Sequence, residues 1–157
     1  MRQQQNKEYL TKEKHRELVN ELDFLKTTRR KEVAEHLEYA KSLGDLSENA
    51  EYHEARNSQA EIEERIAHLE AVLKIAEIVG PRQSDTVGIG STVSVQKEKE
   101  MTPRTYSLVG SEESNMAAGK ISDHSPLGAA MMGKKKGDSF SVATPGGEVK
   151  YSILSVQ

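Results

Sequence analysis

Hydrophobic residues in the first half of the chain recur at helical spacing. The first stripe of such residues consists of Leu18, Leu22, Leu25, Val33, Leu37 and Ala40. Its spacing is interrupted once, by a step of eight residues from Leu25 to Val33. No Gly or Pro interrupts residues 12–43, so this stretch predicts one helix of about 30 residues, about 45 Å long. Thr11 is the expected N-cap, and Gly44 is the expected left-handed residue that ends the helix.

A second stripe alternates +3 and +4 steps without a break, which is the pattern of a coiled-coil seam. Its members are Tyr52, Ala55, Gln59, Ile62, Ile66, Leu69, Leu73 and Ala76. The two helices that carry these stripes are the arms of the predicted structure. Because the connection between them is short, they must run antiparallel. We therefore predict a helical hairpin over residues 1–80, with a polar lead-in at 1–10, an acidic tip at 44–49 and an end at Gly80-Pro81. Most of its apolar side chains lie away from the tip, so the base should pack and the tip should project.

Beyond a linker at residues 81–90, the hydrophobic period changes to two. Alternating segments at 92–95, 105–109, 139–142 and 149–154 predict strands. Ser125-Pro126 is typical of an N-cap followed by proline at the first helical position, and opens a short helix to about Met132. The turn residues Thr144-Pro145-Gly146-Gly147 join the last two strands. The fold class is thus α+β, with a mostly antiparallel β domain over residues 91–157.

Composition narrows the possible functions. Hydrophobic residues make up 35 % of the chain and charged residues 30 %, which favours an elongated molecule with much surface. The absence of cysteine excludes disulfides and thiolate zinc sites. The polar N-terminus and the lack of a long apolar stretch predict neither a signal peptide nor a membrane span, so we expect a cytoplasmic protein. The net charge of −3 argues against bulk coating of nucleic acid, although an acidic first half contains the basic run Lys26–Lys31.

The candidate chemistry lies in carboxylates. No Gly-x-Ser-x-Gly nucleophile motif is present, and the four histidines on the two arms fit ordinary solvated helix faces. Asp45 and Glu48 allow two interpretations: a capping box that opens the second arm, or a pair facing one divalent cation. Because Mg²⁺ usually takes one or two carboxylates plus water and phosphate, this pair would bind it weakly alone. It would act only in a site that already holds a metal and a phosphodiester, as half of a shared site.

Several segments resemble one protein family. They are residues 44–56 (GDLSENAEYHEAR), 21–25 (ELDFL) with Arg29-Arg30, and 121–127, 133–134 and 144–149 of the second domain. Together they are similar to the bacterial GreA/GreB family of transcript cleavage factors. The resemblance implies a coiled-coil hairpin, and an FKBP-like antiparallel β domain that docks beside the secondary channel of bacterial RNA polymerase. The hairpin then enters the channel and stimulates Mg²⁺-dependent cleavage of backtracked RNA near its 3′ end. The protein would complete the polymerase site rather than act as an enzyme itself. We expect the protein to be a monomer. The resemblance also implies the DNA-binding property that is associated with the family.

The resemblance also assigns roles to residues. Asp45 and Glu48 match the pair that assists a second Mg²⁺ within the polymerase complex, with no stable binding alone. Asn49 and Tyr52 match supporting tip positions, and Asp123, Ser125 and Pro126 fall in or near the docking loop. Contacts with RNA or polymerase are expected at Arg29, Arg30, Lys31 and Arg56. For the first three of these, a solvated helix face with ion pairs to Glu32 and Glu35 is the alternative. Ser47 departs from the basic residue of some relatives, and we expect this difference to leave the chemistry unchanged.

Two other functions stay open. One is a channel-binding paralogue that inhibits polymerase without promoting cleavage, which the intact Asp45/Glu48 pair disfavours. The other is a free-standing metal-dependent nuclease, which the small number of candidate ligands disfavours. A prolyl isomerase activity of the β domain is not expected, because aromatic residues make up only 4 % of the chain.

Overall fold

The computed structural model describes residues 7–157, which form two compact units. One unit is the helical segment His15–Ile75. The other combines the described residues up to Lys14 with Ala76–Gln157. A helical hairpin and a β domain with one short α-helix confirm the predicted α+β class. No helix in the described range is both long and apolar enough to cross a membrane.

The first arm is helical throughout but is not one regular α-helix. It consists of α1 (Lys12–Phe24), the π-helical turn η1 (Leu25–Arg29) and α2 (Arg30–Ser42). Thr11 Oγ1 accepts a hydrogen bond from the Lys14 amide at 3.2 Å, as expected for an N-cap.

The π turn explains the gap in the first stripe. The Arg30 amide donates to the Leu25 carbonyl, five residues back instead of four. The eight-residue step from Leu25 to Val33 holds one residue more than a +3/+4 repeat allows, and a π turn absorbs such an extra residue. Val33 therefore returns to the seam, where it is buried in a cluster with Ile62 and Ile66.

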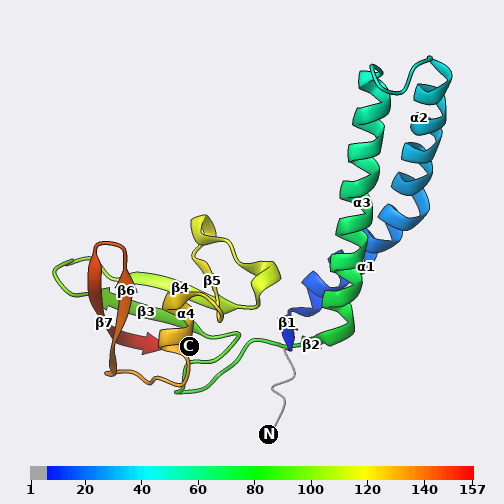
Figure 1. The fold of residues 1–157 in the computed structure, drawn as a ribbon. Coiled ribbons are helices and arrows are strands. Elements are labelled where there is room, and N and C mark those ends of the chain that lie inside the picture. Colours follow the sequence, from blue (N-terminus) through cyan, green and yellow to red (C-terminus); the bar gives the residue numbers. More distant parts are fainter. Residues whose placement is uncertain (1–6) are drawn as a thin grey trace, which may run out of the picture. The chain divides into compact units, whose positions relative to one another are not determined.

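The second arm is α3 (Ala50–Ile75), which runs beside α2 in Figure 1. Its buried residues are Ala55, Ile62, Ile66, Leu69 and Val72. Three expectations are corrected here: Gln59 is exposed, Val72 replaces Leu73 as the buried residue near the base, and the helix ends at Ile75 rather than near Gly80. The helix ends early because the next three residues form a strand.

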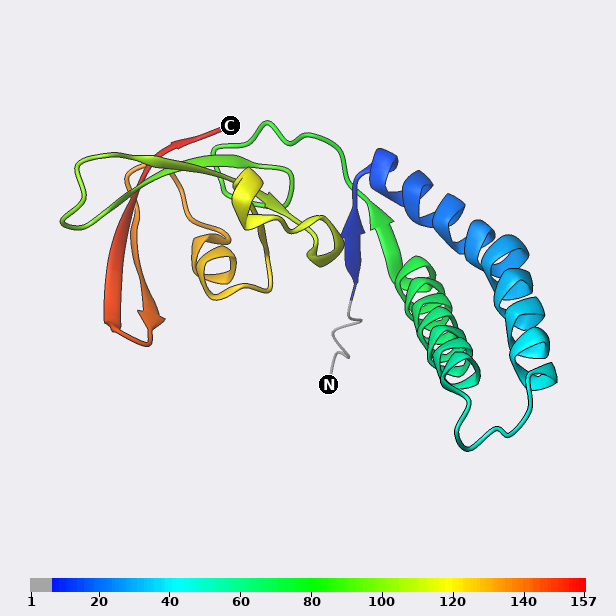
Figure 2. The same cartoon turned by 90° about the horizontal axis from the view of Figure 1, so that it is seen from above.

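That strand, β2 (Ala76–Ile78), pairs in parallel with β1 (Glu8–Leu10), and Figure 2 shows the two side by side. Glu8 lies opposite Ala76 and Leu10 opposite Ile78. The sequence pattern predicts a polar lead-in at residues 8–10 and a helical seam that includes Ala76, and both predictions are wrong, because these residues form the two paired strands. Residues 1–6 of the lead-in lie outside the described range. A pairing between segments so far apart leaves no local pattern to recognise. Leu10 is fully buried as a result.

The β domain is a five-stranded sheet in the order β5-β4-β3-β7-β6. Its strands are β3 (Thr92–Lys97), β4 (Arg104–Val109), β5 (Lys120–Ser122), β6 (Ser139–Thr144) and β7 (Gly147–Val156). All neighbours are antiparallel except β4 and β5, which are parallel. The four predicted strands are confirmed, whereas β5 was not predicted because three residues are too short for a visible alternation.

One face of the sheet packs against the short helix α4 (Pro126–Met131), which Figure 2 shows beside the strands. Along β3, Val93 and Val95 are buried, while Thr92 and Ser94 alternate with them as half-buried residues. The core consists of Val87, Val93, Val95, Leu108, Ile121, Met131, Phe140, Val142 and Ile153. Two short 3₁₀ turns, η2 (Ser111–Glu113) and η3 (Met116–Ala118), connect β4 to β5.

Candidate functional site

The hairpin tip exposes every residue from 41 to 48. Gly44 has φ +123°, a conformation that glycine adopts without the steric cost of a side chain. Asp45 then forms an Asx turn, because its Oδ1 accepts hydrogen bonds from the Ser47 amide at 3.0 Å and the Ser47 hydroxyl at 2.8 Å. The backbone bond first, and the hydroxyl bond second, lower the pKa of the Asp45 carboxyl below its usual value of 3.8. Asp45 is thus a carboxylate at neutral pH and is held in place.

The capping-box interpretation of Asp45 and Glu48 is wrong. The N-cap of α3 is Asn49, whose Oδ1 accepts from the Tyr52 amide at 3.1 Å. Asp45 lies five residues before the helix start at Ala50 and makes its hydrogen bonds within its own turn. Glu48 is exposed, and no partner for its carboxylate is found among the described residues. Neither carboxylate is therefore used to cap the helix.

Asn49 also ties the two arms together. Its Nδ2 donates to the Ala40 carbonyl at 2.6 Å, so one side chain satisfies groups at the end of α2 and at the start of α3. Ala40 and Ala55 are fully buried, which extends the packed seam close to the tip. The base of the tip loop is consequently fixed by a cross-arm hydrogen bond as well as by packing.

The first turns of α3 carry a further group of polar contacts. Arg56 Nη1 donates to the Tyr52 hydroxyl at 3.4 Å. The Tyr52 and His53 rings meet edge to face, with centroids 5.8 Å apart. His53 Nε2 lies 3.4 Å from the Ser47 carbonyl oxygen. The sequence predicts only a solvated helix position for His53, whereas the path of the tip loop brings the Ser47 carbonyl to its ring.

The basic run on the first arm is paired with carboxylates. Arg30 makes two hydrogen bonds of 2.7 Å to Glu63 across the hairpin. The other pairs are Lys26–Glu70, Arg29–Glu32 at 2.6 Å and Lys31–Glu35 at 3.8 Å. The expected pairing with Glu32 and Glu35 is therefore present. Because exposed ion pairs contribute little, these cations can exchange partners at small cost, and their contact with RNA or polymerase stays a prediction.

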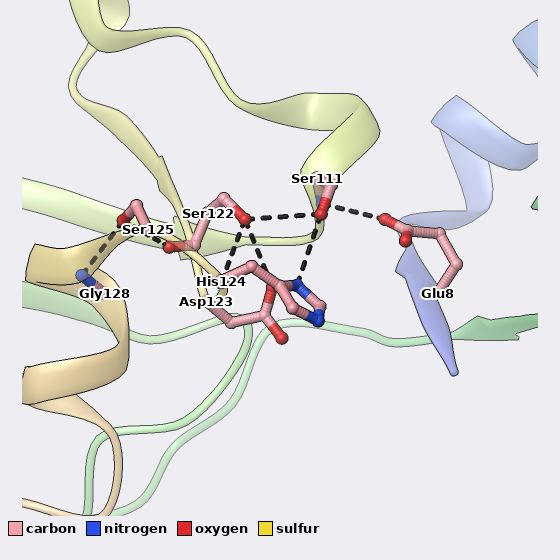
Figure 3. Close-up of polar contacts among 7 residues, drawn as sticks. All are labelled: Glu8, Ser111, Ser122, Asp123, His124, Ser125 and Gly128. Atoms are coloured by element: carbon pink, nitrogen blue, oxygen red, sulfur yellow. Dashed lines mark hydrogen bonds and ion pairs between the residues drawn. The ribbon is translucent and has the colours of Figure 1, made fainter. Parts of the chain in front are cut away.

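The predicted docking loop of the β domain is held by hydrogen bonds (Figure 3). Ser125 Oγ donates to the Ser122 carbonyl at 2.6 Å and accepts from the Gly128 amide at 3.1 Å, which confirms the predicted N-cap of α4. A Cβ on Gly128 would lie 2.0 Å from the Ser122 carbonyl oxygen, so glycine is required for this close approach. Pro126, which follows the cap, is exposed. Ser125 is thus a structural cap, whereas its neighbour Pro126 is exposed, and the docking role of both stays a prediction.

Asp123 and His124 continue this network. Asp123 Oδ1 lies 2.9 Å from His124 Nδ1, and only 12 % of the Asp123 side chain is exposed. His124 Nδ1 is also 3.3 Å from the hydroxyl of Ser111, whose amide donates to Glu8 Oε1 at 2.8 Å (Figure 3). The predicted docking loop is in this way joined to β1, and no local sequence pattern predicts this connection.

The tip carboxylates do not form a complete metal site by themselves. Within residues 7–157, no group of three or more His, Cys, Asp or Glu side chains is placed to hold a metal ion. Asp45 and Glu48 supply carboxylate oxygens, the donors that Mg²⁺ prefers. The donor set fits an ion whose other ligands come from elsewhere.

Comparisons with known proteins agree along nearly the whole chain. Residues 8–78 match the family described as "Transcription elongation factor, N-terminal", and residues 82–157 match "Transcription elongation factor, GreA/GreB, C-term". The transcription elongation factor GreA of Thermoanaerobacter pseudethanolicus is 48 % identical over 150 residues, which cover 94 % of this chain and 96 % of the relative. That of Clostridium acetobutylicum is 43 % identical over 156 residues, or 98 % and 99 % of the two chains. The crystal structure of GreA factor homolog 1 of Thermus thermophilus is 27 % identical, with a TM-score of 0.45 over 97 % of this chain and 99 % of that one. On the two family matches and the identities of the Thermoanaerobacter and Clostridium relatives, the chain belongs to the GreA/GreB family of transcription elongation factors.

Proposed function

We propose that this factor stimulates the Mg²⁺-dependent cleavage of backtracked RNA by bacterial RNA polymerase, and so restarts arrested elongation in the cytoplasm. The observation that carries the proposal is the state of the tip: Asp45 and Glu48 are both exposed at the end of a helical hairpin, and neither caps α3. Two carboxylates presented in this way are available to a second molecule.

The length of the hairpin supports this role. With 26 residues, α3 is about 39 Å long at ~1.5 Å per residue. The buried seam and the Asn49 bond to Ala40 keep the arms together up to the tip loop. The hairpin enters the secondary channel, and the β domain docks at the channel entrance through Pro126 with Asp123 and Ser125 behind it. The factor acts as a monomer.

At the polymerase active site, Asp45 and Glu48 contribute oxygen ligands to an ion that the factor does not bind stably alone. When bound, Mg²⁺ activates water for in-line attack on the phosphodiester. Asp45 arrives ionised and oriented, while Glu48 is free to adjust to the site. Asn49 and Tyr52 maintain the helix start from which the pair projects. Four cations of the two arms contact RNA or polymerase: Arg56 near the tip, and Arg29, Arg30 and Lys31 further along the first arm. Basic side chains attract the RNA polyanion to arms that are otherwise acidic.

The test uses stalled, backtracked elongation complexes with the full-length factor. We expect Asp45→Asn, Glu48→Gln and the double variant each to lower the maximal cleavage rate at least about tenfold, the lower end of what the loss of a metal-site group costs. Glu51→Gln is the matched control, because Glu51 is an exposed carboxylate in the first turn of α3. The factor concentration that gives half of the maximal rate should stay unchanged in the tip variants. It should rise in Pro126→Ala and not in Pro145→Ala, an exposed proline in the turn between β6 and β7.

Three outcomes would contradict the proposal. If the double variant still stimulates cleavage, the tip pair has no role in it. If the purified factor cuts RNA without polymerase, the protein is a free-standing nuclease. If the wild-type factor slows elongation and never promotes cleavage, it is an inhibitory channel-binding paralogue.

A further inference from the structure

Ser47 is the residue of the tip whose contacts the proposed function does not explain. Its amide and its hydroxyl both donate to the same oxygen, Oδ1 of Asp45, at 3.0 and 2.8 Å. Among the described contacts of Asp45, none involves the other oxygen, Oδ2. We propose that Ser47 is a positioning residue: it holds Oδ1 so that Oδ2 of Asp45 is presented to the ion shared with polymerase. This inference rests on the proposed function.

The geometry is that of a carboxylate fixed on one side. A free aspartate exchanges between χ1 rotamers and also rotates broadly about χ2, its last torsion, and each ionised oxygen accepts about two hydrogen bonds. Two donors from a single residue occupy the acceptor positions of Oδ1 and restrict this rotation. A carboxylate ordered before docking loses less conformational entropy when it meets the polymerase site.

Ser47 is itself held from the other side. Its carbonyl oxygen lies 3.4 Å from His53 Nε2, and His53 belongs to the first turns of α3. These contacts connect the Asp45 carboxylate through Ser47 to α3, and the neighbouring Glu48 takes no part in them. From the sequence alone, Ser47 is expected to leave the chemistry unchanged, but the sequence does not show what its side chain contacts. Its hydroxyl is one of the two donors to the carboxylate.

The proposal predicts a graded loss of activity. In stalled complexes, Ser47→Ala should lower the maximal cleavage rate about 2- to 10-fold, the effect of one hydrogen bond. It should also raise the Mg²⁺ concentration required for half of that rate, while the half-saturating factor concentration stays unchanged. Ser47→Thr keeps the hydroxyl and should restore the rate. Ser42→Ala is the matched control, because it removes another exposed serine hydroxyl near the tip, one that donates to the Tyr39 carbonyl at 2.6 Å.

A second measurement needs neither polymerase nor metal. Side-chain coupling constants of Asp45, measured by NMR on the full-length factor, should report one χ1 rotamer in the wild type and in Ser47→Thr. The same couplings should show averaging between rotamers in Ser47→Ala. Retention of a single rotamer and of the full cleavage rate in Ser47→Ala would overturn the inference. A loss in Ser47→Thr as large as in Ser47→Ala would also overturn it, since the hydroxyl would then not be the active feature.

The two proposals fail in different ways. If Asp45→Asn retains wild-type cleavage, the proposed function of the tip is wrong. If Asp45→Asn abolishes cleavage but Ser47→Ala matches the wild type in rate, Mg²⁺ dependence and rotamer, only the role of Ser47 is wrong.

Discussion

The seam and the tip of the hairpin are built from different interactions. In the seam, Val33, Ile62 and Ile66 are buried between the arms, where apolar burial stabilises by about 25 cal/mol per Å². At the tip, even Leu43 and Leu46 are exposed, at 51 % and 42 %, and the order comes from hydrogen bonds around Asp45 and Asn49. Stability and the proposed chemistry thus depend on separate residues, and each should be removable without the other.

The largest expected effect on stability comes from the seam. Ile66→Ala should lower the free energy of unfolding by about 2–5 kcal/mol, because the buried cluster loses methylene groups and gains a cavity. Urea denaturation followed by helical circular dichroism measures it, since most helical residues lie in the hairpin. The matched change at the tip, Leu46→Ala, should shift the unfolding free energy by less than about 0.5 kcal/mol. Equal effects of the two substitutions would remove the distinction between seam and tip.

Asn49 lies where the two regions meet, and its loss should have an intermediate effect. Asn49→Ala removes the N-cap of α3 and the cross-arm bond to Ala40, so we expect a loss of about 0.5–2 kcal/mol in unfolding free energy. Amide hydrogen exchange in the first turn of α3 should become faster. Asn57→Ala, at an exposed position within the same helix, is the control and should not destabilise the protein. Unchanged exchange at Tyr52 in Asn49→Ala would show that the cap has no role in ordering the tip.

The cross-arm pair Arg30–Glu63 should contribute least to the free energy of unfolding, because it flanks the seam in contact with solvent. A double-mutant cycle with Arg30→Gln and Glu63→Gln measures its coupling free energy, which should be smaller than either effect above and should shrink in high salt. Lys31 and Glu35, one helical turn apart at 3.8 Å, provide a weaker pair for comparison. A coupling as large as the Ile66→Ala effect would contradict this order.

The same pair predicts a pH dependence. The hydrogen bond from Arg30 lowers the pKa of Glu63 below its usual value of 4.5. Since the folded pKa lies below the unfolded one, the stabilisation is fully present above the unfolded pKa and is lost as pH falls through the folded pKa. The difference in unfolding free energy between the wild type and Glu63→Gln should therefore be constant near neutral pH and should disappear on acidification. A difference that grows towards low pH would contradict the assigned cause.

Local patterns in the sequence were sufficient to predict much of this protein. The stripes at +3 and +4 predicted both helical arms, and alternation predicted β3, β4, β6 and β7. The Ser125-Pro126 cap and the Pro145-Gly146 turn were also predictable, because each depends on residues close together in the chain. The tip motif identified Asp45, Glu48 and Asn49 as candidate site residues, although it did not reveal what each one does.

What only the tertiary structure decided depends on contacts between distant residues. The pairing of Glu8–Leu10 with Ala76–Ile78 ended the second arm early, and the π turn after Phe24 was required to keep Val33 in register with α3. At the tip, the sequence allowed Asp45 to be either a helix cap or a presented carboxylate. The backbone path of the loop excluded the helix cap, because it placed Asn49 at the helix start and directed the donors of Ser47 to Asp45.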